Sequence, residues 1–344
     1  MADISSELID TEKVSAWIVE RADVEDPLTF ELIAGGRSNM TFTVYDGEIP
    51  KFVLRRPPTG PLLPSAHDMA REYRLMDALS DSHVPVPSMV GLCQDDAVNG
   101  RDFYVMQFVD GIVVRDIDIG SSFSEATRKT MSESLVATLI ALHEVDIDSV
   151  GLGDLAKRTG YIQRQVKRWT GQWQSSRTRD LPIVDAVAEK LMAQMPEPNP
   201  TAIAHGDYRL SNCMVDADGH VVAVLDWELC TLGEPMADLG GLLGYWHDPA
   251  ETDSTGDSET TGLAGFLTQE EIADLYSEGS GVAKDSINYY RAFAQWRLAC
   301  IAEGVYARYL AGQQGDQDED IDLERMNASV GERAERAAQL LGMI

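Results

Sequence analysis

The sequence has few basic residues and no long hydrophobic run. It contains 28 Lys and Arg against 57 Asp and Glu, which gives a formal net charge of −29 over 344 residues. Such a surface repels the phosphates of nucleic acids and of anionic membranes. No run of about 18 or more apolar residues is present, and the N-terminus lacks the apolar core of a signal peptide. We therefore expect a cytoplasmic protein with no nucleic-acid or membrane partner.

Cysteine is also scarce. The four cysteines, Cys93, Cys213, Cys230 and Cys300, are scattered and form no C-x-x-C pair. This spacing argues against both a disulfide framework and a zinc ribbon, so reduced thiols are expected. The hydrophobic content of 44% is nevertheless sufficient for a substantial core.

The chain predicts an α+β fold with two lobes. Runs of β-forming residues at 28–34, 41–45, 52–55, 88–93 and 103–108, with one helix at about 66–79, predict a small antiparallel lobe. The later pattern predicts helices at about 125–143, 157–176, 183–194, 235–245, 282–311 and 322–342. We expect an N-terminal lobe at 1–106, a hinge at 107–112 and a mainly helical lobe at 113–344.

Residues 202–228 carry the strongest chemical signal. They contain His205, Gly206 and Asp207, then Asn212, and an apolar run that ends at Asp226. Phosphoryl transfer depends on positioning and charge neutralisation, and these residue types suit both tasks. Asp207 can accept or orient the proton of an acceptor hydroxyl, while Asn212 and Asp226 offer the hard oxygen ligands that Mg²⁺ prefers.

This segment resembles the catalytic machinery of kinases. The pattern H-x-D-x-x-x-x-N, followed by an apolar strand and Asp, resembles the catalytic loop and metal-binding segment of protein kinases. The H-G-D form with D-W is similar to the aminoglycoside and choline phosphotransferase branch. The resemblance implies a bilobal protein-kinase-like fold that uses ATP, with GTP not excluded, and Mg²⁺. It also implies structural roles for His205, which braces the loop, and for Asp238, which ties the next helix to it.

Other expected kinase parts follow in chain order. The nucleotide-binding candidates are Gly35, Gly36, Ser38, Asn39, Arg55, Glu72, Gln107 and Val109. The turn at 35–39 can expose backbone N–H groups to phosphates, although a plain hairpin turn fits it equally well. Arg55 stands where kinases have a phosphate-binding Lys, the neighbouring Arg56 could share its role, and Glu72 is the expected partner of that cation. Gln107 and Val109 fall at the linker that would bind adenine.

A basic segment points to the acceptor. Residues 157–179 hold seven basic residues and no acidic one. Helical spacing groups the substrate-binding candidates Arg164, Lys167, Arg168 and Trp169, which would attract phosphate or carboxylate groups, unless they pair with the protein's own acids. The pattern Y-x-x-R-Q-x-x-x-W-x-x-Q-W at 161–173 is similar to kinases associated with acyl-CoA dehydrogenases. That resemblance implies a hydroxyacyl-CoA acceptor.

The residues leave other functions open. The leading hypothesis is an ATP- and Mg-dependent phosphotransferase with an alcohol group as acceptor. Alternatives are a nucleotide-binding module without turnover, suggested by Arg55 in place of Lys, and a kinase for an aminoglycoside, sugar or amino alcohol. A metal-dependent hydrolase that uses His205, Asp207 and Asp226 fits less well, because no His-rich ligand group lies near them in the sequence. The sequence does not define the oligomeric state.

Overall fold

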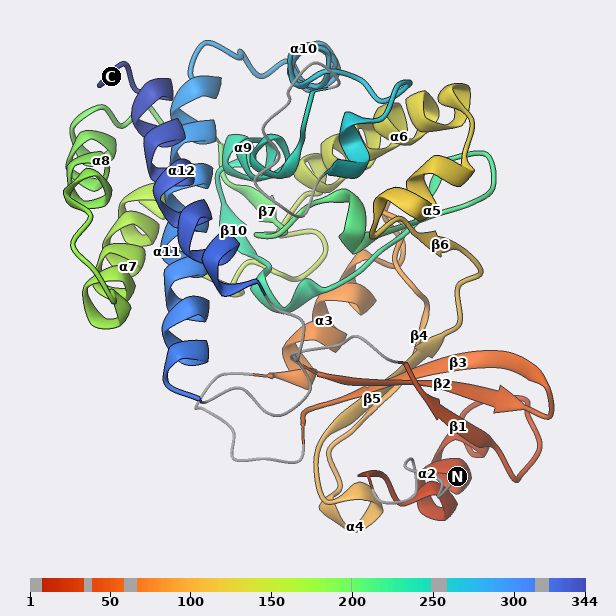
Figure 1. Ribbon diagram of the computed structural model, residues 1–344. Helices are drawn as coiled ribbons and strands as arrows, with labels where there is room; N and C mark the ends of the chain where they lie inside the picture. Colours follow the sequence, from red (N-terminus) through yellow and green to blue (C-terminus); the bar gives the residue numbers. More distant parts are fainter. Residues whose placement is uncertain (1–7, 34–38, 59–66, 199, 249–258, 313–321) are drawn as a thin grey trace. The chain divides into compact units, whose positions relative to one another are not determined.

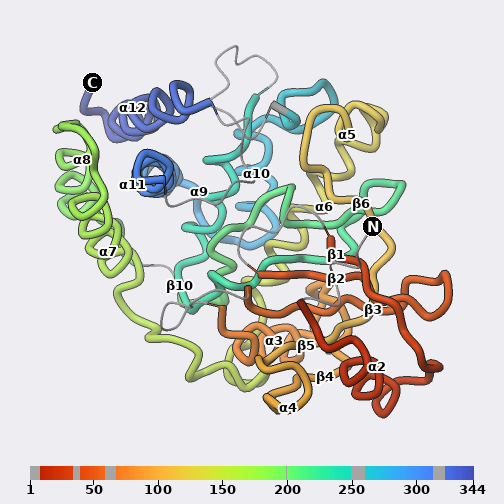
Figure 2. The backbone as a smooth tube through the Cα atoms, turned by 60° about the horizontal axis from the view of Figure 1, so that its bottom comes forward, coloured from red at the N-terminus to blue at the C-terminus, as the bar shows by residue number. Residues whose placement is uncertain are grey.

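The computed structural model describes residues 8–33, 39–58, 67–198, 200–248, 259–312 and 322–344 (Figures 1 and 2). The chain forms two compact units. The first extends to Ile112 and includes Val150–Leu152 and Val222–Glu228, and the second contains the remaining residues. The lobe and hinge boundaries expected from the sequence stay a prediction.

A five-stranded antiparallel sheet forms the centre of the first unit. Its order is β1-β2-β3-β5-β4. The strands, labelled in Figure 1, are β1 (Thr29–Leu32), β2 (Met40–Asp46), β3 (Ile49–Arg56), β4 (Met89–Cys93) and β5 (Phe103–Gln107). All five predicted β runs are confirmed. Alternation along β3 buries Phe52 and Leu54 on one face of the sheet, so Arg55 lies on the other face.

Helices pack on the sheet of the first unit. Helix α2 (Thr11–Val19) buries Trp17 and Ile18 in the same cluster as Phe42, Leu54 and Phe103. Helix α3 (Met69–Leu79) packs against β4 and β5, and the short α4 (Asp96–Asn99) contacts α2. The helix expected at 66–79 is confirmed, whereas the sequence pattern did not predict α2.

The second unit is mainly helical, which confirms the α+β fold class. Its helices are α5 (Ile117–Ser122), α6 (Glu125–Glu144), α7 (Tyr161–Ser176), α8 (Pro182–Ala193), α9 (Pro235–Tyr245), α10 (Gln269–Ser280), α11 (Ile287–Leu310) and α12 (Leu323–Leu340). Helix α11 packs against α7, α8, α9 and α12 (Figures 1 and 2). Gly240 permits the contact with α9, because a Cβ there would lie 2.6 Å from the Tyr290 backbone.

Short strands and turns connect these helices. Strand β7 (Ala202–Ala204) pairs antiparallel with β10 (Thr231–Gly233), and the remaining short strands are β6 (Ile112–Val113), β8 (Cys213–Val215) and β9 (Val221–Val224). Helix α7 starts later than the expected residue 157. Gly160 precedes its first residue and adopts a left-handed conformation with φ 65°, which a helix cannot continue through. Over the described part of the chain, no helix is both long and apolar enough to cross a membrane.

Candidate active site

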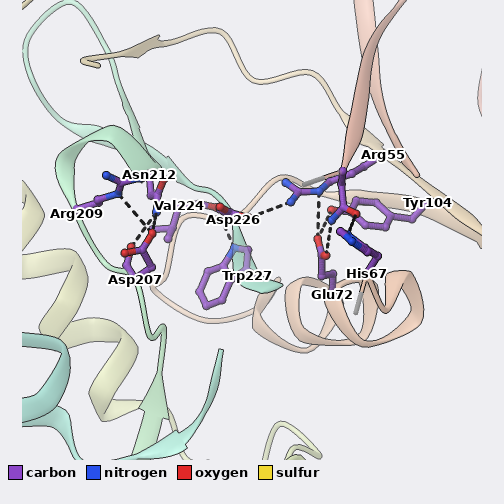
Figure 3. A network of polar contacts seen from close by, with 11 residues as sticks. Arg55, His67, Glu72, Tyr104, Asp207, Arg209, Asn212, Val224, Asp226 and Trp227 are labelled. Carbon is purple, nitrogen blue, oxygen red and sulfur yellow. Dashed lines mark hydrogen bonds and ion pairs between the residues drawn. The ribbon is translucent and has the colours of Figure 1, made fainter. Parts of the chain in front are cut away.

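The loop after β7 holds Asp207 and Asn212 together. The Nδ2 of Asn212 donates to the backbone oxygen of Asp207 at 2.8 Å and to its Oδ2 at 2.9 Å (Figure 3). The side chain of Asp207 is 17% exposed, so its carboxylate is reachable but partly shielded. Gly206 makes the preceding turn with φ 84°, and a Cβ at this position would lie 2.7 Å from the backbone oxygen of Leu229. The spacing of five positions between Asp207 and Asn212 therefore allows Asn212 to bind both the backbone and the carboxylate of Asp207.

Asp238, at the first turn of α9, anchors this loop. Its carboxylate accepts the backbone N–H of His205 at 2.5 Å and that of Gly206 at 2.9 Å, and His143 Nε2 lies 3.4 Å away. Burial acts to raise the pKa of Asp238, but its contacts with His143, His205 and Gly206 hold the pKa below its ordinary value. His205 is fully buried, and its Nδ1 accepts the N–H of Asp207 at 3.3 Å. Asp238 and His205 therefore both make hydrogen bonds to the backbone of the loop that carries Asp207.

Two arginines that the sequence analysis did not select also reach the loop. Arg209 Nε lies 3.4 Å from Asp207 Oδ2 (Figure 3), and its guanidinium carbon lies 4.8 Å from the centre of the Tyr245 ring. Burial and the charge of Asp207 raise the pKa of Tyr245 to about 12, so its phenol stays neutral. Arg297 of α11 donates to the Gly206 carbonyl. Arg209 lies within the H-G-D-Y-R motif, whereas no local signal links Arg297 to the loop.

Arg55 and Glu72 form a buried ion pair in the first unit. Arg55 Nε lies 3.3 Å from Glu72 Oε2, and Arg55 Nη2 lies 2.9 Å from Asp226 Oδ1 (Figure 3). Tyr104 donates its hydroxyl to Glu72 Oε2 at 3.0 Å. Burial raises the pKa of Glu72, although Arg55 and Tyr104 oppose the shift. Burial opposes the charge on Arg55, but Tyr104, Glu72 and Asp226 together raise its pKa above the ordinary value.

Asp226 follows β9 in an unusual backbone conformation. Its φ is 61°, in the left-handed region that non-glycine residues seldom adopt. Trp227 is buried beside it and donates its indole N–H to the Val224 carbonyl at 3.0 Å (Figure 3). The Asp226 side chain is 35% exposed. The local fold thus holds a carboxylate in a position that solvent or a ligand can reach.

The remaining nucleotide candidates differ in their surroundings. Gly35, Gly36 and Ser38 lie outside the described residues. Asn39 is buried, donates to Glu72 Oε1 at 3.1 Å and has its Oδ1 2.7 Å from His67 Nδ1. Its side chain therefore supports Glu72. Arg56 lies on the opposite sheet face from Arg55 and donates to the carbonyls of Pro57 and Leu8, so the two arginines do not share one site.

The predicted linker residues end the sheet. Gln107 is the last residue of β5, and its backbone N–H donates to the Ser88 carbonyl at 2.8 Å. Val109 follows outside the strand and is partly buried. The contact expected between these two residues and the nucleotide base would be made by backbone groups. The residue type therefore gives little signal for such a contact.

The basic candidates of α7 divide into two kinds. Arg164 donates to the carbonyls of Thr159 and Lys157, so its guanidinium secures the start of the helix. Lys167 and Arg168 are exposed and form no ion pair with any described residue. Trp169 donates its indole N–H to Gln165 Oε1 at 3.1 Å. The described hydrogen bonds and ion pairs connect none of the four candidates to Asp207.

The chemistry of the donors suits Mg²⁺, although the ligands are few. No group of three or more His, Cys, Asp and Glu side chains that could hold a metal occurs in the described ranges. Asn212 and Asp226 each carry a hard oxygen, and nucleotide phosphates commonly complete such sites. By donor type, each residue therefore suits an ion that also binds a phosphate ligand.

The sequence matches a known protein family over most of its length. The model of the phosphotransferase enzyme family matches residues 29–267. The chain is 35% identical to acyl-CoA dehydrogenase family member 11 of Homo sapiens over 86% of this chain and 38% of that protein. It is 36% identical to family member 10 of Mus musculus over 81% of this chain and 26% of that protein. The chain thus spans less than two fifths of these relatives.

Solved structures share the fold. A Ralstonia eutropha protein, provisionally named an aminoglycoside phosphotransferase, is 33% identical, with a TM-score of 0.83 over 97% of this chain and 98% of that one. An ADP-bound aminoglycoside phosphotransferase shares the fold at 15% identity and a TM-score of 0.58, over 96% of this chain and 99% of that chain. The family match covers the loop of Asp207 as well as Arg55, Glu72 and Asp226. The chain belongs to the phosphotransferase enzyme family.

Proposed function

We propose that the protein transfers the terminal phosphoryl group of ATP to a hydroxyl of a small molecule, with the help of Mg²⁺. One observation carries the proposal: in a member of the phosphotransferase family, Asp207 presents a reachable carboxylate that Asn212 holds in place. A carboxylate so placed can accept the proton of an attacking hydroxyl. Its loop is braced by buried contacts to Asp238, so little reorganisation is needed during the reaction.

The other residues have roles in charge and position. Arg55 is proposed to contact the nucleotide phosphates, and Glu72 orients its guanidinium. We assign Asn212 and Asp226 as Mg²⁺ ligands from the motif and from each residue's oxygen donors. When bound, the ion would neutralise charge on the phosphates. Arg209, next to the Asp207 carboxylate, adds a cation on the side where the hydroxyl would react.

Nucleotide use is supported by related structures. Names of fold neighbours include complexes with ADP, with ATP and with GDP, so GTP stays an alternative donor. We propose that backbone groups of Gly35, Gly36, Ser38 and Asn39 cover the phosphates. Gln107 and Val109 would bind the base through their backbones. Since the side chain of Asn39 is engaged with Glu72, only its backbone is assigned to the nucleotide.

A hydroxyacyl-CoA is the proposed acceptor. Curated relatives are named as acyl-CoA dehydrogenase family members, and the exposed cations Lys167 and Arg168 suit the phosphates of a CoA tail. Trp169 lies beside this pair, with the Arg168 guanidinium 5.5 Å from its ring. We propose that the reaction takes place in the cytoplasm on a soluble substrate.

The test is ADP release by the purified protein with ATP and Mg²⁺. The acceptor panel contains 3- and 4-hydroxyacyl-CoAs, sugars, choline and aminoglycosides. The proposal predicts release that hydroxyacyl-CoAs stimulate and EDTA abolishes. Stimulation only by an aminoglycoside or a sugar would keep the kinase and reject the CoA assignment.

A nucleotide-binding module without turnover is the second candidate. The observation in its favour is that Arg55 occupies the position of the kinase Lys and pairs with Asp226. Such a module would bind ADP and release none from ATP with any acceptor. Equilibrium binding of ADP, measured beside the turnover assay, separates the two functions.

A further inference from the structure

Arg55 contacts two carboxylates at the same time. Its Nε faces Glu72 on α3, and its Nη2 faces Asp226 after β9 (Figure 3). All three residues belong to the first unit. A planar guanidinium presents several donors in a fixed fork and can bridge two acceptors, whereas a lysine ammonium is a single nitrogen. The arginine at this position therefore creates a contact with Asp226 in addition to the pair with Glu72.

The two ends of this bridge differ in how firmly they are held. Glu72 has a side chain that is only 3% exposed, and it also accepts hydrogen bonds from Asn39 and Tyr104. Asp226 is 35% exposed, and the hydrogen bond and ion pair that its carboxylate makes with the described residues are both to Arg55. The contact with Glu72 is thus fixed by several partners, while the contact with Asp226 is the one that can open.

A cation beside Asp226 opposes a second cation at the same carboxylate. Arg55 Nη2 lies 2.9 Å from Asp226 Oδ1, so its positive charge compensates the carboxylate that a divalent ion would need. The phosphates of a nucleotide would compete with Asp226 for the same guanidinium, because arginine binds phosphate and carboxylate through the same fork. Occupation of Arg55 by phosphates would leave the carboxylate available.

Resting on the nucleotide binding proposed above, we propose that Arg55 withholds Asp226 from divalent cations until nucleotide phosphates engage the guanidinium. Binding of nucleotide and binding of the ion then favour each other, and the coupling is equal in both directions. The metal ligand is in this way reserved for an ion that arrives with its nucleotide. Arg55 acts as a positioning residue toward Asp226 as well as a phosphate contact.

The experiment measures Mn²⁺ binding by electron paramagnetic resonance, with and without ADP. It compares the wild type, Arg55→Gln and a matched control, Lys51→Gln, which removes an exposed positive charge from the same strand. Without ADP, Arg55→Gln should bind Mn²⁺ about fivefold or more tightly than the wild type. With ADP it should bind Mn²⁺ no more tightly than the wild type, and Lys51→Gln should follow the wild type in both. Adding Asp226→Asn to Arg55→Gln should remove the gain.

Unchanged or weaker Mn²⁺ binding by nucleotide-free Arg55→Gln would overturn the inference. If Arg55 had only a structural role, its replacement would not strengthen Mn²⁺ binding, either without or with ADP. If that variant does not fold, Arg55→Lys decides the question. Glu72, held by its own partners, would retain the ammonium, so the gain should have the same sign and be smaller. No gain with Arg55→Lys would then reject the role. Absence of ADP binding in all proteins would reject the proposed function, while the nucleotide-free titration would still decide on Arg55.

Discussion

At the scale of single residues, Asp238 shows how a buried carboxylate can hold a loop in place. It accepts two backbone N–H groups of the loop that carries Asp207. The asparagine side chain has one acceptor oxygen instead of two, so one of these buried N–H groups would lose its hydrogen-bond acceptor. We expect Asp238→Asn to lower the free energy of unfolding at pH 7 by about 2–5 kcal/mol, as measured by urea denaturation.

The stability that Asp238 contributes should depend on pH. Because the folded protein holds the pKa of Asp238 below its ordinary value, the stability it contributes is present above the unfolded pKa of about 3.9 and is lost as the pH falls through the folded pKa. The difference between wild type and Asp238→Asn should therefore shrink as the pH falls below about 4. A variant as stable as the wild type at pH 7 would contradict the anchoring role.

Two of the contacts among the candidate residues follow from local features of the sequence. The motif places Asn212 five positions after Asp207, and in the structure Asn212 Nδ2 lies 2.9 Å from Asp207 Oδ2. Glu72 was expected to pair with Arg55 and does so. Arg297 could not be found in this way, because its contact with Gly206 joins residues 91 positions apart in the sequence. Such contacts depend on how helices pack against one another. Short sequence motifs carry no information on that packing.

At the scale of elements, the basic side chains of α7 differ in whether they bind the protein's own backbone or are exposed to ligands. Arg164 is used at the start of the helix, while Lys167 and Arg168 remain exposed. If the two exposed cations bind an anionic acceptor, Lys167→Glu with Arg168→Glu should raise KM for hydroxyacyl-CoA about tenfold, since each exposed ion pair is worth roughly 1 kcal/mol or less. The Kd of ADP, measured by calorimetry, should not change.

A charge reversal elsewhere supplies the control for α7. Lys51→Glu reverses an exposed lysine on β3 and should leave KM for the acceptor as in the wild type. An equal rise in KM for both proteins would indicate a general charge effect. An unchanged KM in the α7 double variant would place the acceptor elsewhere.

The elements that the sequence analysis missed have identifiable causes. Helix α10 carries a capping box between Thr268 and Glu271, a local signal that was present in the sequence and was not used. Helix α2 has only nine residues and an N-terminal cap at Asp10, so its periodicity covers little more than two turns. Longer helices such as α6, with 20 residues, repeat their apolar stripe often enough to be recognised.

At the scale of the whole molecule, the net charge of −29 sets the conditions for substrate binding. A surface of this charge repels phosphate-bearing ligands on average, so their binding requires local groups of cations. Arg55 supplies a cation in the first unit, and Arg209, Lys167 and Arg168 supply cations in the second. The acidic surface and the basic local groups are therefore compatible with a kinase for an anionic acceptor.

The proposed activity depends on one carboxylate, and replacing it is the most direct test. Asp207→Asn keeps the size of the side chain and should lower kcat for acceptor-dependent ADP release by about 10²- to 10⁴-fold, because it removes the proton acceptor. The Kd of ADP should stay within about twofold, since no nucleotide role is assigned to Asp207. Turnover of Asp207→Asn near the wild-type rate, at saturating ATP, Mg²⁺ and acceptor, would contradict the assignment of this loop as the catalytic centre.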